Sequence, residues 1–171
     1  MEVIIRPPNV DDASAINEIR RMDGVRENTL GLISEPVSRN VQFLQNLDRN
    51  NHMLVAEVDG KVVGMASLMQ STHPRMNHTG SIGISVHRDF QSKGVGRKLM
   101  EALIDIADNW LMLVRIELGV IEDNKKARSL YESLGFVKEG VKRMSIIRGG
   151  RYCDEIMMSR IKVAKQLRDF K

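Results

Sequence analysis

The segment that decides the fold is Val86-His-Arg-Asp-Phe-Gln-Ser-Lys-Gly-Val-Gly-Arg-Lys-Leu99, which joins an expected strand to an expected helix. Before the loop, residues 81–86 alternate β-branched and small side chains, a pattern typical of a strand. After the loop, apolar side chains recur at helical spacing, at Val95, Leu99, Leu103, Ile106 and Trp110. This spacing predicts a single helix from about Gly94 to Trp110.

The loop between strand and helix, residues 91–96, has glycines at positions 94 and 96. Without side chains, the backbone can approach an anion closely and point several N–H groups at it. The N-terminus of the following helix adds a partial positive charge there. Lys93, Arg97 and Lys98 add full charges around the same loop. The loop therefore predicts a diphosphate site, with a plain helix-capping loop as the alternative.

The glycine spacing excludes two common nucleotide motifs, Gly-x-x-x-x-Gly-Lys-Ser/Thr and Gly-x-Gly-x-x-Gly. It matches Gln/Arg-x-x-Gly-x-Gly/Ala, and so resembles the pyrophosphate loop of the GNAT acetyltransferase superfamily. A second motif, Asn124-Lys-Lys-Ala-Arg-Ser-Leu-Tyr-Glu-Ser-Leu-Gly-Phe136, is similar to that family's Asn-x-x-Ala-x-x-x-Tyr-x-x-x-Gly-Phe block. The resemblance covers most of the chain, and residues 108–110, 115–118 and 150–154 resemble bacterial amino-acid acetyltransferases of the YhhY type.

The order of expected elements is βααβββαβαββ. Strands are expected at 2–6, 53–58, 61–68, 78–86, 115–120, 138–147 and 152–161, and Asp59-Gly60 predicts a hairpin. Helices are expected from Asn9, from Ser38, at 94–110 and at 124–134, with residues 162–171 helical or frayed. A crossover helix makes the fourth and fifth strands parallel, whereas the hairpins are antiparallel. The prediction is an α/β protein with a mixed sheet and helices on both faces, which matches the GNAT fold.

The resemblance implies that acetyl-CoA lies where the fourth and fifth strands separate. Its pantetheine arm would pair with the backbone of Ile84 and Val86, and a backbone N–H near Ile84 or Ser85 would bind the thioester oxygen. Its pyrophosphate would lie on the loop amides. The cofactor-binding residues implied in this way are Ile84, Ser85, Val86, Gln91, Ser92, Lys93, Gly94, Val95, Gly96, Arg97, Asn124, Ala127 and Tyr131.

Tyr131 matches the family's tyrosine near the CoA sulfur, where a phenol can donate a proton to the leaving thiolate. Its alternative role is packing against the sheet. Asn124 binds the cofactor arm, caps a helix, or does both. The sequence does not identify the general base. Glu117 and His78 are candidates, and the alternative is proton transfer to solvent or through a water chain. Acceptor-site candidates are Asn28, Thr29, Tyr152 and Asp154, for which ordinary loop or strand capping is the alternative.

Composition bounds the remaining possibilities. The chain has 171 residues, a length that predicts a single domain over 1–171, and a net charge of +4. The sequence has no basic stripe interleaved with aromatic residues, the pattern typical of nucleic-acid binding. The loop cations suit a polyanionic cofactor instead. Cys153 is the only cysteine, no metal site is expected, and no apolar run is long enough for a membrane. The polar N-terminus is unlike a signal peptide, so the cytoplasm is the expected compartment.

The resulting hypothesis is an acetyl-CoA-dependent N-acetyltransferase that transfers acetyl directly to a small primary amine, with a free amino acid as one candidate. The alternatives are a protein N-terminal or lysine acetyltransferase and a non-catalytic CoA-binding or partner-binding module. A homodimer through the C-terminal strands or helix faces is also expected, from the family resemblance and from the apolar run at residues 156–158.

Overall fold

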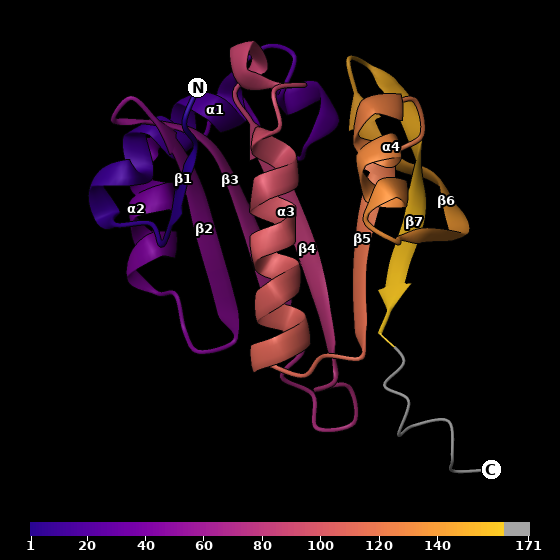
Figure 1. Cartoon of the computed structure of the whole chain (residues 1–171). Helices are drawn as coiled ribbons and strands as arrows, with labels where there is room; N and C mark the ends of the chain where they lie inside the picture. The colour runs from indigo at the N-terminus through magenta and orange to yellow at the C-terminus, as the bar shows by residue number, and fades with distance from the viewer. Residues whose placement is uncertain (163–171) are drawn as a thin grey trace, which may run out of the picture. The chain divides into compact units, whose positions relative to one another are not determined.

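The computed structural model describes residues 1–162, which form a seven-stranded sheet in the order β1-β2-β3-β4-β5-β7-β6 (Figure 1). The strands are β1 Ile4–Arg6, β2 Asn51–Val58, β3 Lys61–Gln70, β4 Thr79–Val86, β5 Arg115–Ile121, β6 Val137–Arg148 and β7 Arg151–Ile161. The α-helices are α1 Ala13–Arg21, α2 Val37–Gln45, α3 Val95–Asp105 and α4 Lys125–Ser133. Short 3-10 turns lie at Val10–Asp12, Arg26–Asn28 and Arg88–Phe90.

The sheet is mixed, as predicted. β4 and β5 are parallel and pair from Thr79 with Arg115 to Ser81 with Glu117, the first three residues of each strand. β5 pairs with β7, and β7 with β6, in antiparallel register, as β1 does with β2. Asp59 and Gly60 both have positive φ, 49° and 76°, which is the backbone of a type I′ turn and confirms the predicted hairpin.

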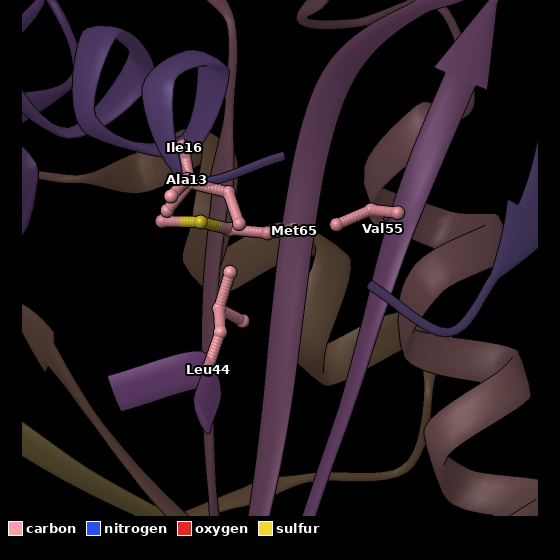
Figure 2. Close-up of a cluster of buried hydrophobic side chains, with 5 residues drawn as sticks. All are labelled: Ala13, Ile16, Leu44, Val55 and Met65. Carbon is pink, nitrogen blue, oxygen red and sulfur yellow. The ribbon is translucent and has the colours of Figure 1, made fainter. Parts of the chain in front are cut away.

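The chain forms two compact units, of which the first contains Met1–Leu68 and Gly83–Leu103. On one face of its strands, Met65 and Val55 pack with Ala13, Ile16 and Leu44 from the first two helices (Figure 2). On the opposite face, Gly64 lies against α3, because a Cβ built there would be 3.1 Å from Leu99 and 3.2 Å from Val95. Within this unit helices therefore cover both faces of the strands, as predicted.

The second unit contains Met69–Ile82 and the described residues from Ile104 onward. Its core is formed by alternate residues of β5 and β7 with the aromatic rings that lie near the end of α4 and just after it: Ile116, Leu118, Val120, Ile156, Met158, Tyr131 and Phe136 are all buried. Ile156 and Met158 are only 4% and 1% exposed and belong to the core, whereas Met157 between them is half-buried. The run therefore offers little surface for the expected homodimer, because β7 is an inner strand of the sheet.

The helix predicted to reach Trp110 is α-helical only to Asp105. Residues Ile106–Trp110 form a π-helix, in which the Leu111 N–H donates to the Ile106 carbonyl at 3.0 Å. The wider turn brings Ala107 and Asp108 inward, and Asp108 accepts two hydrogen bonds of 2.8 Å from the Arg160 guanidinium. Trp110 is consequently 77% exposed, which contradicts its expected place on the buried face.

The start of α2 also differs from the expected one. This helix begins at Val37 with Pro36 in the extended N-cap position, so Ser38 is not the cap. At the other end of the chain, residues 163–171, part of the segment expected to be helical or frayed, lie outside the described residues. None of the helices in residues 1–162 combines the length and apolarity needed to span a membrane.

Candidate functional site

The glycine loop leads directly into α3, and its backbone is exposed. Ser92 and Gly94 have positive φ values of 60° and 86°, and Gly94 accepts the first helical hydrogen bond from Lys98 N at 3.1 Å. Val95 and Leu99 are fully buried and anchor the helix beneath the exposed loop. A Cβ on Gly94 would meet nothing within 4 Å. The space above Gly94 is therefore open. Gly94 precedes the helix and has no side chain that could hydrogen-bond the free N–H groups of the first helical turn.

The loop is held in place by its own side chains. Gln91 donates from Nε2 to the Val86 carbonyl at 3.2 Å, and the His87 N–H donates to the Val63 carbonyl at 2.9 Å. The His87 ring in turn accepts a hydrogen bond from the Asp89 N–H at 3.2 Å. Gln91 was expected to contact the cofactor through its backbone amide; its side chain closes the loop, a role that the motif did not reveal. The Val86 carbonyl retains a second lone pair for another donor.

Two of the loop cations have defined contacts. The Lys93 ammonium lies 5.5 Å above the centre of the Phe90 ring, a cation–π geometry that orients this charge on the loop. Arg97 lies 3.5 Å from Glu101, one turn further along α3. The arrangement concentrates positive charge around exposed backbone N–H groups at a helix N-terminus, which is the usual chemistry of a phosphate site.

The second motif forms α4. Asn124 is its N-cap, and the Asn124 Oδ1 accepts a hydrogen bond from the Ala127 N–H at 3.2 Å. This contact confirms the capping role predicted for Asn124. Asp123, immediately before it, receives two hydrogen bonds from the Arg148 guanidinium, at 2.9 and 2.5 Å, and Arg148 lowers the pKa of this carboxyl. The pair ties the start of α4 to the end of β6.

Tyr131 is buried, with 7% of the residue exposed. Its ring packs at a centroid distance of 6.0 Å against Phe136, the last residue of the motif. Burial raises the pKa of the phenol to about 12, so the hydroxyl is protonated at any physiological pH. The hydrogen bonds found among residues 1–162 include none from this hydroxyl. The site thus holds a neutral phenol with a proton available for a ligand.

Comparison with known proteins gives the family: residues 19–136, which contain both motifs, match the Acetyltransferase (GNAT) family. The chain belongs to the GNAT family. It is 36% identical over 163 residues to the L-amino acid N-acetyltransferase AaaT of Escherichia coli, covering 94% of this chain and 99% of that protein. It is 35% identical over 107 residues to the L-amino acid N-acyltransferase MnaT of the same species, covering 62% of each chain.

Solved structures confirm the GNAT fold. A GNAT acetyltransferase from Streptococcus pneumoniae superposes with a TM-score of 0.81 at 26% identity, covering 94% of this chain and 100% of that one. The structure of yncA from Salmonella typhimurium with its cofactor acetyl-CoA superposes with a TM-score of 0.82 at 24% identity, covering 96% and 97%. The predicted family and fold are therefore correct, and the chain is a member of an enzyme family of acetyltransferases.

The two residues expected as candidate general bases, His78 and Glu117, have defined positions on β4 and β5. His78 precedes the first residue of β4, and its carbonyl accepts hydrogen bonds from Val114 and Arg115. It therefore lies at the opposite end of β4 from the glycine loop. Glu117 accepts hydrogen bonds of 3.1 and 3.0 Å from Arg115, in the half of β5 that pairs with β4. Both bonds end on Oε2, so Arg115 pairs with one oxygen of this carboxylate.

The acceptor candidates on β7 have different surroundings. Asp154 accepts a hydrogen bond from the Met144 N–H at 2.8 Å and so holds a bulge between Lys142 and Ile146 of β6. This is the capping role given as its alternative. Tyr152 is 63% exposed and lies opposite Ile147, beside the turn that joins β6 to β7.

The remaining candidates lie between α1 and α2. Asn28 ends a 3-10 turn, and the Thr29 hydroxyl accepts a hydrogen bond from Gly31 N at 3.4 Å. Glu35 organises this segment: its carboxylate is buried, and Arg20 and Arg39 approach it to 3.2 and 3.3 Å. Sequence reasoning missed Glu35, because a Glu-Pro pair reads only as a break. Across residues 1–162, no cluster of three His, Cys, Asp or Glu residues could hold a metal ion.

Proposed function

We propose that the protein is an acetyl-CoA-dependent N-acetyltransferase whose acceptor is the primary amine of a small molecule, a free L-amino acid. The observation that carries this proposal is the open backbone at Gly94, at the head of α3, in a GNAT chain. A relative that aligns with nearly the whole chain, AaaT, is an L-amino acid N-acetyltransferase. The extent of that alignment favours an amino acid over the polypeptide acceptors of other family members.

The residues present fit the cofactor. The N–H groups of residues 91–96 would hold its pyrophosphate, since Gly94 leaves the space above them open and Lys93 and Arg97 stand beside them. The backbone of Ile84 to Val86 would pair with the pantetheine arm, and an N–H there would stabilise the oxyanion. Asn124 and Ala127 would border the same arm. Acetyl-CoA supplies the acetyl group as a thioester.

Tyr131 would donate its proton to the departing thiolate. The phenol is protonated at neutral pH, as its ordinary pKa of 10.0 already ensures, and therefore has a proton to donate. The amine attacks directly in a ternary complex, so no acyl-enzyme is required. Cys153, the single cysteine, is buried and has no part in this scheme.

The decisive assay measures free thiol released from acetyl-CoA across a panel of amines. The panel contains L-amino acids, polyamines, and peptides with a free N-terminus or a lysine. Turnover with amino acids is the expected result. Turnover restricted to peptides would transfer the proposal to a protein acetyltransferase, and acetyl-CoA binding without turnover on any amine would make the chain a non-catalytic CoA-binding module.

The homodimer also belongs to this proposal, with β6 as its contact. β6 is an edge strand of the sheet, and four of its apolar residues, Val137, Val141, Met144 and Ile147, are between 44% and 74% exposed. An exposed apolar edge strand is a ready surface for pairing. Light scattering at micromolar concentration should give twice the chain mass, and Val141→Lys should return the monomer.

We further propose a cytoplasmic enzyme whose partners include neither nucleic acid nor membrane.

A further inference from the structure

Glu155 on β7 lies directly against the backbone of β5. It is paired with Ile121, and Gly119 precedes Ile121 by two residues, so all three share one face of the sheet. A Cβ built on Gly119 would lie 1.9 Å from the Glu155 Oε1 and 2.6 Å from its Cδ. Even alanine would therefore displace this carboxylate. Gly119 leaves a notch in the interior of a strand, and Glu155 occupies it.

The Glu155 carboxylate has unused hydrogen-bonding capacity. Its side chain is 22% exposed, and it forms an ion pair with Lys142, whose Nζ lies 3.6 Å from Oε2. The hydrogen bonds found within residues 1–162 include none that ends on the Glu155 side chain. By contrast, Glu139 on β6 receives hydrogen bonds of 2.8 and 2.6 Å from Arg115 and one of 2.6 Å from Ser159. The Glu155 carboxylate can therefore accept hydrogen bonds from a ligand as well as from solvent.

The Glu155 carboxylate lies against a part of β5 that suits an acceptor site. Pairing with β4 involves Arg115, Ile116 and Glu117, and Gly119 lies beyond it, in the C-terminal half of β5. The family resemblance implies that acetyl-CoA lies where β4 and β5 separate, and β5 is no longer paired with β4 beyond Glu117. Gly119 is exposed, whereas Leu118 and Val120 on the other face are buried. An amine that approaches β5 on the Gly119 face would meet the Glu155 carboxylate.

We propose that Glu155 binds the acceptor amine and takes its proton during acetyl transfer, an inference that rests on the proposed function. The amine nitrogen forms the new C–N bond to the thioester carbonyl carbon, and the C–S bond breaks. The nitrogen loses its proton to the Glu155 carboxylate, which later releases it to solvent. The thiolate leaves with a proton from Tyr131, and the phenol is then reprotonated from solvent.

Few charged groups share this face near Glu155. They are Lys142, directly opposite on β6, and a group of three further along the sheet, in which Arg115 donates hydrogen bonds to both Glu117 and Glu139. The Cys153 thiol lies two residues away on β7 and is buried. The alternative is a cross-strand ion pair that only stabilises the sheet. Lys142 is 58% exposed, so such a pair contributes little, and removing it should be nearly neutral.

The test compares Glu155→Gln with Lys142→Gln as the matched control, both measured with an amino-acid acceptor. Glu155→Gln should lower kcat/KM by about 10² to 10⁴-fold, the range of general base catalysis. Its Kd for acetyl-CoA, by calorimetry, and its melting temperature should stay unchanged. Its deficit should shrink as pH rises toward the pKa of the amine, because more acceptor is then already deprotonated. Lys142→Gln should change kcat/KM by less than about threefold.

A second variant keeps the carboxylate but moves it. Gly119→Ala forces Glu155 out of the notch, and should lose activity as Glu155→Gln does while still binding acetyl-CoA. Near wild-type turnover in either folded variant would overturn the inference, as would an equal loss in Lys142→Gln. These outcomes are distinct from failure of the proposed function, in which the wild-type protein itself would acetylate no amine.

Discussion

The starts of α3 and α4 are two helix N-termini built in opposite ways. Before α3 stands Gly94, which has no side chain, and the backbone around it is open. Before α4 stands Asn124, whose side chain accepts the Ala127 N–H at 3.2 Å. One helix start leaves its donors for an anion, whereas the other satisfies a donor itself and positions a buried phenol two turns later. The difference supports separate roles for the two junctions: the first would bind the anion, and the second fixes the helix that carries Tyr131.

The largest expected effect comes from closing the open junction. Gly94→Asp places a side chain and a negative charge against the diphosphate, and acetyl-CoA affinity measured by calorimetry should fall by about 10²-fold or more. Because the backbone of residue 94 has a φ of 86°, the aspartate also introduces strain of about 1–3 kcal/mol.

Gly60→Asp is the control for that strain. Gly60 has φ of 76° and likewise nothing within 4 Å of a built Cβ, but it lies in the β2–β3 hairpin. It should lose similar stability and keep its acetyl-CoA affinity. Unchanged affinity in a folded Gly94→Asp protein would remove the loop from the cofactor site.

The next effect concerns the buried phenol. Tyr131→Phe keeps the ring and its packing on Phe136 but removes the donor. We expect kcat to fall by about 10²-fold, the lower end for general acid catalysis, since a thiolate is already a tolerable leaving group. The acetyl-CoA Kd and the melting temperature should hardly change. Wild-type kcat would show that the thiolate leaves with solvent help, and a loss of stability would show a structural partner for the hydroxyl.

A smaller effect tests the closed junction. Asn124→Ala removes the cap of α4 and should lower the free energy of unfolding by about 1 kcal/mol in denaturant titration. Asn9→Ala is the matched control, because Asn9 accepts the Asp12 N–H at 3.2 Å in a capping box remote in sequence from both motifs. Only Asn124→Ala should also weaken acetyl-CoA binding. Equal behaviour of the two variants would reduce Asn124 to a cap.

The smallest effect is the alkaline titration of the phenol. The chain has two tyrosines, so in Tyr152→Phe the ultraviolet absorbance reports Tyr131 alone. Burial raises the pKa of Tyr131 to about 12 from an ordinary value of 10.0. The neutral phenol is therefore favoured in the folded state, and its contribution to stability is complete below pH 10 and lost as the pH rises toward 12. Ionisation near the ordinary value in the folded protein would contradict the burial.

Much of the architecture is local and could be predicted from the sequence. Asp59-Gly60 needs only its own backbone preference to form a hairpin, and the alternation along β5 and β7 shows which residues are buried. The glycine spacing at 94 and 96 and the block from Asn124 to Phe136 are sufficient to identify the family. These signals can be read from the sequence because neighbouring residues carry them.

Tertiary contacts decided the rest. Trp110 continues an apolar helical spacing, yet it is exposed because Asp108 pairs with Arg160, which is distant in sequence, and the helix widens to permit this. Glu117 is a candidate base by its position in the sequence, and the structure shows that Arg115 pairs with one of its carboxylate oxygens. Glu155 carried no signal, since its role depends on a notch at Gly119 in another strand. Sequence thus determined the family and the fold, whereas the state of each carboxylate depended on partners that only folding brings together.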